Sequence, residues 1–289
     1  MSRKLRAAVL ALVSVALVCV GAAQAQEPAR ILPVGDAATE FVFALGAGDQ
    51  VVARDSTSRF PPEVLSLPDI GYMRQLSPEG VLSVTPDLIL LQAGAGPPET
   101  LQQLRATGLP LVTLEGGFDP AQVLDNIRLI GAALGRAPQA DALARSQQAV
   151  FAQLADMVAQ GPHPRVMFVL SDQAGRLNVA GAGTGADGIL RLAGAENVMA
   201  DAYTGYRLVS DEAILQAAPD IVVMLDHTGR PEMDAPAADL WRNAALAGTP
   251  AGQRQALVRV APAALAFGPR TAEMAAHLRQ DLLAAAAPQ

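Results

Sequence analysis

Short runs of aliphatic residues alternate with amphipathic stretches along most of the chain. The aliphatic runs predict strands at Arg30–Val34, Gln50–Ala53, Leu88–Leu91, Leu111–Thr113, Val166–Leu170, Leu177–Ala180, Ile221–Leu225 and Leu257–Val260. The stretches between them predict helices, among them Ala37–Leu45, Pro78–Ser83, Glu99–Thr107 and Pro120–Leu134. Strands that alternate with helices in this way are typical of an α/β protein built on parallel sheets.

One predicted helix is much longer than the others. Pro138 suits the first turn of a helix, and no glycine or proline follows it up to Gln160. Gly161-Pro162 then ends the segment. A helix of this length would span about 34 Å. Because it lies near the middle of the chain, we expect an N-terminal α/β lobe over residues 26–136, an interlobe helix over 137–161 and a C-terminal α/β lobe over 162–289.

The two expected lobes contain a repeated segment. The sequence from Ser77 to Ile89 returns 133 residues later, and both copies begin with Ser-x-Glu and continue through Pro-Asp into a strand. In each copy the serine caps a short helix and the glutamate, Glu79 or Glu212, lies near the positive end of the helix dipole. On the residues alone, helix capping is a sufficient role for both glutamates.

The composition indicates a folded, exported protein. The chain is 51% apolar with a mean hydropathy of +0.26, which excludes a disordered protein. Residues 1–25 combine a basic start, a short apolar run and a final Ala-Gln-Ala, the pattern of a signal peptide rather than of a membrane anchor. Their removal takes away Cys19, the only cysteine, and changes the net charge from −7 to −10. The mature chain therefore has no thiol chemistry, and its acidity argues against nucleic acid as a partner.

Several motifs resemble the cleft-type substrate-binding proteins of ABC importers for cobalamin, siderophores and haem. The resemblance covers essentially the whole mature chain and includes Gly35–Gly46, Asp55–Ser58 and the paired Ser-x-Glu repeats. Residues 71–77, 182–188 and 267–270 are similar specifically to the periplasmic haem-binding proteins. The resemblance implies two Rossmann-like lobes bridged by one long helix, which is also the architecture expected from the pattern above.

The resemblance also implies how haem would be held. It makes Tyr72 the axial ligand of the haem iron and Arg74 its support. A free phenol is protonated at neutral pH, but ferric iron and a neighbouring guanidinium both favour the anion. In an extended chain, residues two apart share a face, so Arg74 could reach the Tyr72 oxygen. A half-buried structural tyrosine beside a surface arginine is the alternative.

Haem also carries two propionates, which a strongly acidic protein must meet with local cations. Arg207, in the echo of the Tyr72 motif at Gly205-Tyr206, is the candidate from the second lobe. Arg54 and Arg59 are further candidates, and a solvated surface position is the alternative for each.

Residues 183–188 read Gly-Thr-Gly-Ala-Asp-Gly and so fit the dinucleotide fingerprint G-x-G-x-x-G. An exported protein meets little NAD, and free amides at a helix N-terminus can hold a propionate as well as a phosphate. We therefore expect Thr184 near the ligand.

The resemblance gives Glu79 and Glu212 a second role. In the family such carboxylates, one on each lobe, dock into arginine pockets of the permease. Two matching charges on two matching lobes suit a partner with two-fold symmetry. Docking and helix capping are compatible.

Other chemistries find little support in the sequence. Of His163, His227 and His277, only His227 follows a predicted strand, and the chain contains neither H-x-x-x-H nor G-x-S-x-G. We expect a monomeric periplasmic protein, not an enzyme, that carries hemin (haem b) to an inner-membrane ABC permease dimer with its ATPase. A cobalamin or ferric-siderophore binding protein is the alternative within the class, and an exported α/β enzyme is the alternative outside it.

Overall fold

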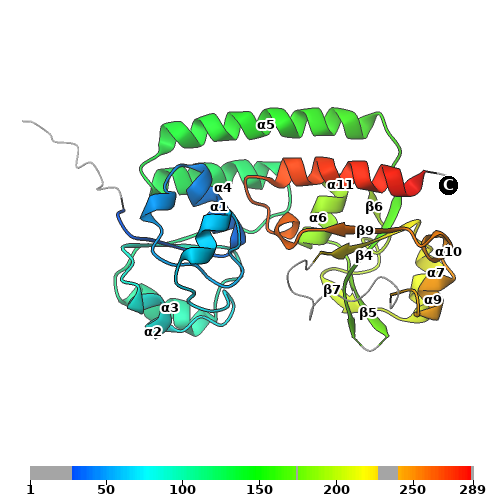
Figure 1. The fold of residues 1–289 in the computed structure, drawn as a ribbon, viewed down its shortest axis with the longest axis horizontal. Coiled ribbons are helices and arrows are strands. Elements are labelled where there is room, and N and C mark those ends of the chain that lie inside the picture. The colour runs from blue at the N-terminus through cyan, green and yellow to red at the C-terminus, as the bar shows by residue number, and fades with distance from the viewer. Residues whose placement is uncertain (1–27, 174, 227–239, 288–289) are drawn as a thin grey trace, which may run out of the picture.

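The computed structural model describes residues 28–173, 175–226 and 240–287 (Figure 1). Two α/β lobes lie side by side beneath the long helix α5 (Ala137–Ala159). We call the described residues up to 136 lobe 1 and those from 162 onward lobe 2. This arrangement confirms the expected fold class, whereas the predicted signal peptide at residues 1–25 lies outside the described residues.

Lobe 1 is built on a parallel sheet of three strands in the order β1-β2-β3. Its strands and helices are β1 (Ile31–Val34), α1 (Asp36–Ala44), η1 (Gly48–Gln50), η2 (Pro62–Ser66), α2 (Pro78–Ser83), β2 (Leu88–Leu91), α3 (Pro98–Ala106), β3 (Leu111–Thr113) and α4 (Pro120–Ala133). The predicted strand Gln50–Ala53 is wrong: Val51 forms a single bridge to Ile31. The turn η1 brings the chain beside β1 for this one residue only.

Helix α5 connects the lobes as predicted, and its end points differ from the predicted ones by one residue. Its buried positions Ala140 and Ala144 come first along the helix, and Phe151 and Leu154 follow. The N-terminal part packs on α4, while other parts contact α6 (Gly185–Leu192) and α11 (Thr271–Ala286) of lobe 2. Among the described residues, no helix has both the length and the apolarity needed to cross a bilayer.

Lobe 2 contains a mixed sheet, which corrects the prediction of parallel sheets throughout. The strand order is β7-β5-β4-β8-β9, with β6 beside β4, and β5 is antiparallel to both β4 and β7. The remaining elements of this lobe are β4 (Arg165–Gln173), β5 (Arg176–Ala180), β6 (Glu196–Asn197), β7 (Tyr206–Leu208), α7 (Asp211–Ala217), β8 (Ile221–Leu225), α9 (Ala244–Ala247), α10 (Pro250–Arg254), β9 (Leu257–Val260) and η3 (Pro262–Leu265). Only residues 174 and 175 connect β4 to β5, which is far too short for a parallel crossover.

The sequence repeat corresponds to a structural repeat. Helix α2 precedes β2 in lobe 1, and helix α7 precedes β8 in lobe 2. Ser77 Oγ accepts a hydrogen bond from the Gly80 amide at 3.0 Å, and Ser210 Oγ accepts one from the Ala213 amide at 3.2 Å. The predicted serine caps are therefore present in both copies.

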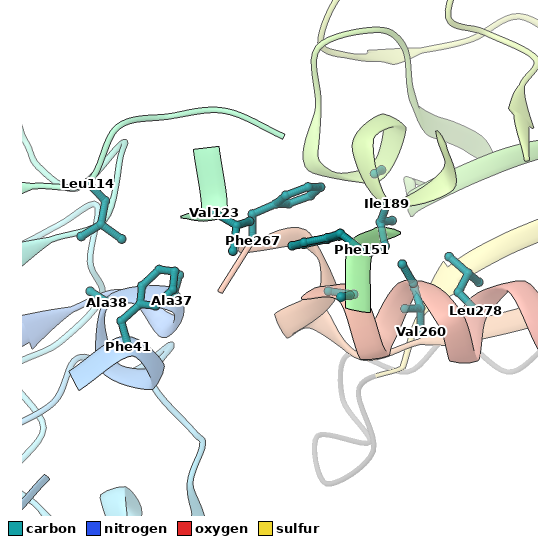
Figure 2. Packing of buried hydrophobic residues seen from close by; sticks show 14 of the residues in the cluster. Ala37, Ala38, Phe41, Leu114, Val123, Phe151, Ile189, Val260, Phe267 and Leu278 are labelled. Carbon is teal, nitrogen blue, oxygen red and sulfur yellow. The ribbon is translucent and has the colours of Figure 1, made fainter. Parts of the chain in front are cut away.

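One hydrophobic core runs through both lobes, and Figure 2 shows part of it. Val123 of α4 and Phe267 of lobe 2 belong to this core together with Phe151 of α5. The Phe267 ring meets the Phe118 ring of lobe 1 edge-on, with centroids 5.3 Å apart. The two lobes are thus joined by packed side chains as well as by a covalent connection.

Candidate functional site

A cleft of about 730 Å³ opens between the two lobes at the carboxyl ends of several strands. Asp36, Gln92 and Asp226 line it, and they closely follow the last residues of β1, β2 and β8 respectively. In open α/β sheets this edge is where ligands bind. The described residues that line it are Asp36, Ser56, Thr57, Arg59, Tyr72, Met73, Arg74 and Gln92 from lobe 1, with Leu225, Asp226, Pro262, Leu265 and Ala266 from lobe 2.

Tyr72 and Arg74, predicted as a pair, both line this cleft. Tyr72 is 40% exposed, whereas Met73 between them is buried. The expected extended chain is wrong here, because the Gln75 amide donates to the Tyr72 carbonyl at 2.8 Å and closes a turn. The Gly96 amide donates to the Met73 carbonyl at 2.9 Å and anchors that turn to the loop after β2. The turn, rather than strand alternation, presents both side chains to the cleft.

The neighbouring wall is organised around the buried carboxylate of Asp55. Its oxygens accept hydrogen bonds from the amides of Gly35 (2.8 Å) and Thr57 (2.9 Å) and from the hydroxyls of Thr57 and Ser58 (2.5 Å each). A carboxylate satisfied in this way holds its loop firmly against the end of β1. Ser56 and Thr57 are thereby positioned on the cleft wall.

Arg54 and Arg59 beside this loop have different surroundings. The Arg54 guanidinium forms an ion pair with Asp69 at 3.0 Å and donates to the Asp55 carbonyl at 3.1 Å, so it holds the loop. Arg59 is exposed and lines the cleft. Of these two predicted propionate candidates, Arg59 is the one that reaches the cavity.

Asp36 lies at the start of α1 and is strongly perturbed by its surroundings. Burial raises its pKa to about 7, and the negative charges of Glu40 and Asp55 add to this effect. A backbone hydrogen bond from Arg59 and the charge of Arg270 oppose it. A protonated carboxyl in a cleft can donate a hydrogen bond to an anionic ligand, which an ordinary aspartate cannot do. Sequence analysis did not single out Asp36, although its place just after β1 was a usable signal.

Arg207, predicted for the cleft, faces elsewhere. It lies on β7 with its guanidinium 5.2 Å above the ring of Tyr203, and it is not among the residues that line the cleft. Its neighbour Tyr206 points to the opposite face of the strand. Burial raises the pKa of Tyr206, while the neighbouring Thr184 side chain, the Ala186 backbone and the charge of Arg74 act in the opposite direction. Tyr206 follows a glycine as Tyr72 does, and the sequence suggested no further role for it. In the structure it is a lobe 2 residue near Arg74.

Thr184 is buried at the N-terminus of α6. Its hydroxyl donates to the Gly181 carbonyl at 3.0 Å and accepts from the Asp187 amide at 3.1 Å. It does not itself line the cleft, and the contact with Tyr206 connects it to that region.

The glycines of the G-x-G-x-x-G motif have a packing role. A Cβ on Gly185 would collide with Leu265, and a Cβ on Gly188 would collide with Phe118 and Phe267. These glycines let α6 approach lobe 1 and η3 closely, so the motif is explained without a nucleotide.

The two glutamates of the repeat lie outside the cleft. Glu79 on α2 and Glu212 on α7 are both exposed. The described part of the chain contains no cluster of three or more His, Cys, Asp or Glu side chains that could hold a metal ion. His163 Nδ1 is 2.8 Å from the Gly194 carbonyl oxygen, and His277 is exposed on α11. His227 lies outside the described residues.

Comparisons with known proteins place this geometry in a family. The model described as periplasmic binding protein matches residues 34–264. The solved structure of the periplasmic heme-binding protein RhuT from Roseiflexus sp. RS-1, in apo form, is 34% identical with a TM-score of 0.84, and the match covers 89% of this chain and 99% of that one.

Curated relatives differ in the ligand that they name. The uncharacterized ABC transporter substrate-binding lipoprotein YvrC of Bacillus subtilis is 28% identical over 70% of this chain. The vitamin B12-binding protein of Pectobacterium atrosepticum is 29% identical over 68% of this chain. The chain spans 65% and 71% of the length of these two relatives. The matched family consists of binding components of transport systems rather than enzymes, and the chain belongs to this periplasmic binding protein family.

Proposed function

We propose that this protein is the periplasmic haem-binding component of an ABC importer. It captures hemin in the cleft between its lobes and delivers it to the inner-membrane permease dimer and its ATPase. The likeness to haem-binding proteins of known structure supports this choice, and the cleft supplies the chemistry. Residues 1–25 direct export, and one copy of the chain serves one permease dimer.

The observation that carries the proposal is the pairing of a phenol with a guanidinium on one cleft wall. Tyr72 and Arg74 line the same cavity and come from one anchored turn. A phenolate is a hard ligand suited to ferric iron, and a neighbouring cation lowers the free energy of the anion. In this proposal Tyr72 is the axial ligand of hemin and Arg74 supports its charge.

The propionates are assigned to cations at the cleft and its rim. Arg59 meets one propionate directly, since it lines the cavity. Asp36, when protonated, donates a hydrogen bond to the same anionic edge. Arg207 lies over the Tyr203 ring outside this lining and contributes only its positive charge at longer range, and Thr184 acts through its contact with Tyr206.

Glu79 and Glu212 dock the loaded protein on the permease. Both side chains are exposed and lie at matching positions of the structural repeat. Their charges are available to cationic pockets of a two-fold symmetric partner.

Absorbance spectroscopy tests the ligand assignment. Titration of the purified protein with hemin is expected to develop a stable Soret band with ferric charge-transfer features, and Tyr72→Ala is expected to weaken and shift this spectrum. Binding of hemin to Tyr72→Ala with an unchanged spectrum would contradict the role of Tyr72.

Cobalamin is the second candidate, because a vitamin B12-binding protein is among the relatives. Calorimetric titrations with hemin and with cyanocobalamin under the same conditions separate the two. Tighter binding of cyanocobalamin would replace the haem assignment.

A further inference from the structure

Two leucines at matching positions of the structural repeat are exposed to solvent. Leu82 on α2 is 37% exposed, and Leu215 on α7 is 51% exposed. They are separated by the same 133 residues that separate the two copies of the repeat. A single exposed leucine is ordinary on a protein surface. Here the same position of the repeat carries an exposed leucine in both lobes, so the two leucines are better explained together than separately.

Neither leucine belongs to the hydrophobic core, although Leu215 lies close to Gly248 after α9. Directly before them, Val81 and Ile214 are almost completely buried and supply the apolar face of each helix. Ser77 and Ser210 already cap the two helices. Both leucines thus belong to an outward face that contributes little to the core.

Each leucine has a carboxylate as its helical neighbour. Glu79 precedes Leu82 by three positions, as Glu212 precedes Leu215, and residues three apart lie next to each other on a helix surface. Within the described part of the chain, no ion pair involves either glutamate. Each lobe therefore presents one carboxylate and one isobutyl group side by side, available to a partner.

We propose that Leu82 and Leu215 are the apolar anchors of two equivalent docking surfaces, each completed by the neighbouring glutamate. The occupant is the permease dimer, which must offer twice a cationic side chain beside an apolar depression. This proposal rests on the proposed function, because it deepens the docking role given there to Glu79 and Glu212.

The two components of each surface are expected to act on different rates. A charge at the rim of an interface mainly accelerates association and sets orientation. An apolar side chain that becomes buried mainly slows dissociation. Two matched charge–leucine pairs also explain how a single chain engages a symmetric dimer through both of its lobes.

The test compares two double variants of the full chain. The first is Leu82→Ser with Leu215→Ser, and the second is Glu79→Gln with Glu212→Gln. Binding to the cognate permease–ATPase complex in lipid nanodiscs is followed by surface interferometry, with both hemin-free and hemin-loaded protein. The leucine variant is expected to dissociate about tenfold faster, and the glutamate variant to associate about tenfold more slowly at low salt.

A matched control uses exposed leucines that the repeat does not duplicate. Leu65 is 46% exposed and Leu129 is 36% exposed, so Leu65→Ser with Leu129→Ser removes comparable apolar surface elsewhere. Its dissociation rate is expected to stay within about twofold of the natural protein, as is the hemin affinity of all three variants.

The outcomes separate the inference from the proposed function. Unchanged dissociation of the leucine variant, with slowed association of the glutamate variant, overturns the anchor role and leaves the docking glutamates in place. If neither double variant alters binding to the permease, both the anchors and the docking role are wrong. Failure to bind hemin refutes the ligand assignment alone, since docking is measured without hemin as well.

Discussion

The two walls of the cleft differ in chemistry although the two lobes share a repeat. Lobe 1 contributes most of the polar lining, with Tyr72, Arg74 and Arg59 prominent in it. Among the described residues, the lobe 2 lining is mostly apolar, with Asp226 as its charged residue. Within the described part of the chain, the polar side chains of the lining are therefore concentrated on lobe 1, although the two lobes share the repeat.

The matching tyrosines show how this difference arises. Tyr72 belongs to a turn that opens on the cleft, whereas Tyr206 belongs to β7 and lies over the N-terminus of α6. The antiparallel addition of β5 and β7 exists only in the sheet of lobe 2. A change in local backbone is enough to give equivalent residues different neighbours.

The largest expected effect concerns Asp36, on the lobe 1 wall of the cleft, and the pH dependence of the free energy of unfolding. The pKa of Asp36 is raised from 3.8 to about 7, so between these pH values the folded chain holds a proton that the unfolded chain has lost. This stabilisation is present at low pH and is lost as pH rises, and it amounts to about 4 kcal/mol in total. Asp36→Asn is expected to remove this dependence, as measured by urea unfolding of hemin-free protein from pH 4 to pH 8.

The exposed Asp141 of α5 supplies a control for this experiment. Asp141→Asn is expected to retain the pH dependence of the natural protein. If Asp36→Asn retains it too, Asp36 ionises normally in the folded state.

The second prediction compares the two tyrosines directly. Tyr72→Phe removes only the proposed ligand oxygen and is expected to weaken hemin binding about 100-fold, or about 2.7 kcal/mol. Tyr206→Phe is expected to weaken it less than about threefold, because its hydroxyl is engaged at α6. Hemin titrations followed at the Soret band measure both, and equal effects would show that the walls are chemically equivalent.

The third prediction concerns the seam behind the cleft. Glu40 of lobe 1 is buried and forms a bidentate ion pair with Arg270, whose guanidinium lies 3.6 Å above the Phe60 ring. Glu40→Gln leaves a partly exposed cation without its partner and is expected to cost about 2 kcal/mol of unfolding free energy. It also removes one charge that raises the pKa of Asp36, so the pH dependence should shift downward. Urea unfolding measures the loss, and an unshifted pH dependence would contradict the coupling.

The smallest effect separates arginine geometry from charge. Arg74→Lys keeps the charge but loses the planar guanidinium, and it is expected to weaken hemin binding about tenfold. Arg207→Lys, on the far face of β7, is expected to change it less than about twofold. If, in hemin titrations, Arg207→Lys weakens binding as much as Arg74→Lys does, Arg207 contacts the ligand after all.

Local sequence signals predicted much of this protein. The absence of helix breakers after Pro138 was enough for α5, and serines followed by glutamates marked α2 and α7. Such features depend on residues within a few positions of one another. Tyr72 was singled out by the resemblance of its motif to a known family, and the turn that carries it was not predicted.

Other features depend on residues far apart in the chain. Glu40 and Arg270 are 230 residues apart, and no local pattern connects them. The antiparallel pairing of β5 and the packing of Gly188 on Phe118 likewise follow from how whole elements meet.

The chain's local pattern thus sufficed for its longer helices, most of its strands and its repeat, since backbone propensity and capping act over short distances. The candidate ligand Tyr72 came from the resemblance of its motif to a known family. Only the tertiary structure showed that Arg59 lines the cleft and that Arg207 lies over the Tyr203 ring. The raised pKa of Asp36 likewise results from burial in the folded protein. Burial, electrostatic environment and the direction of a side chain are properties of the assembled lobes, because each depends on neighbours that only folding brings together.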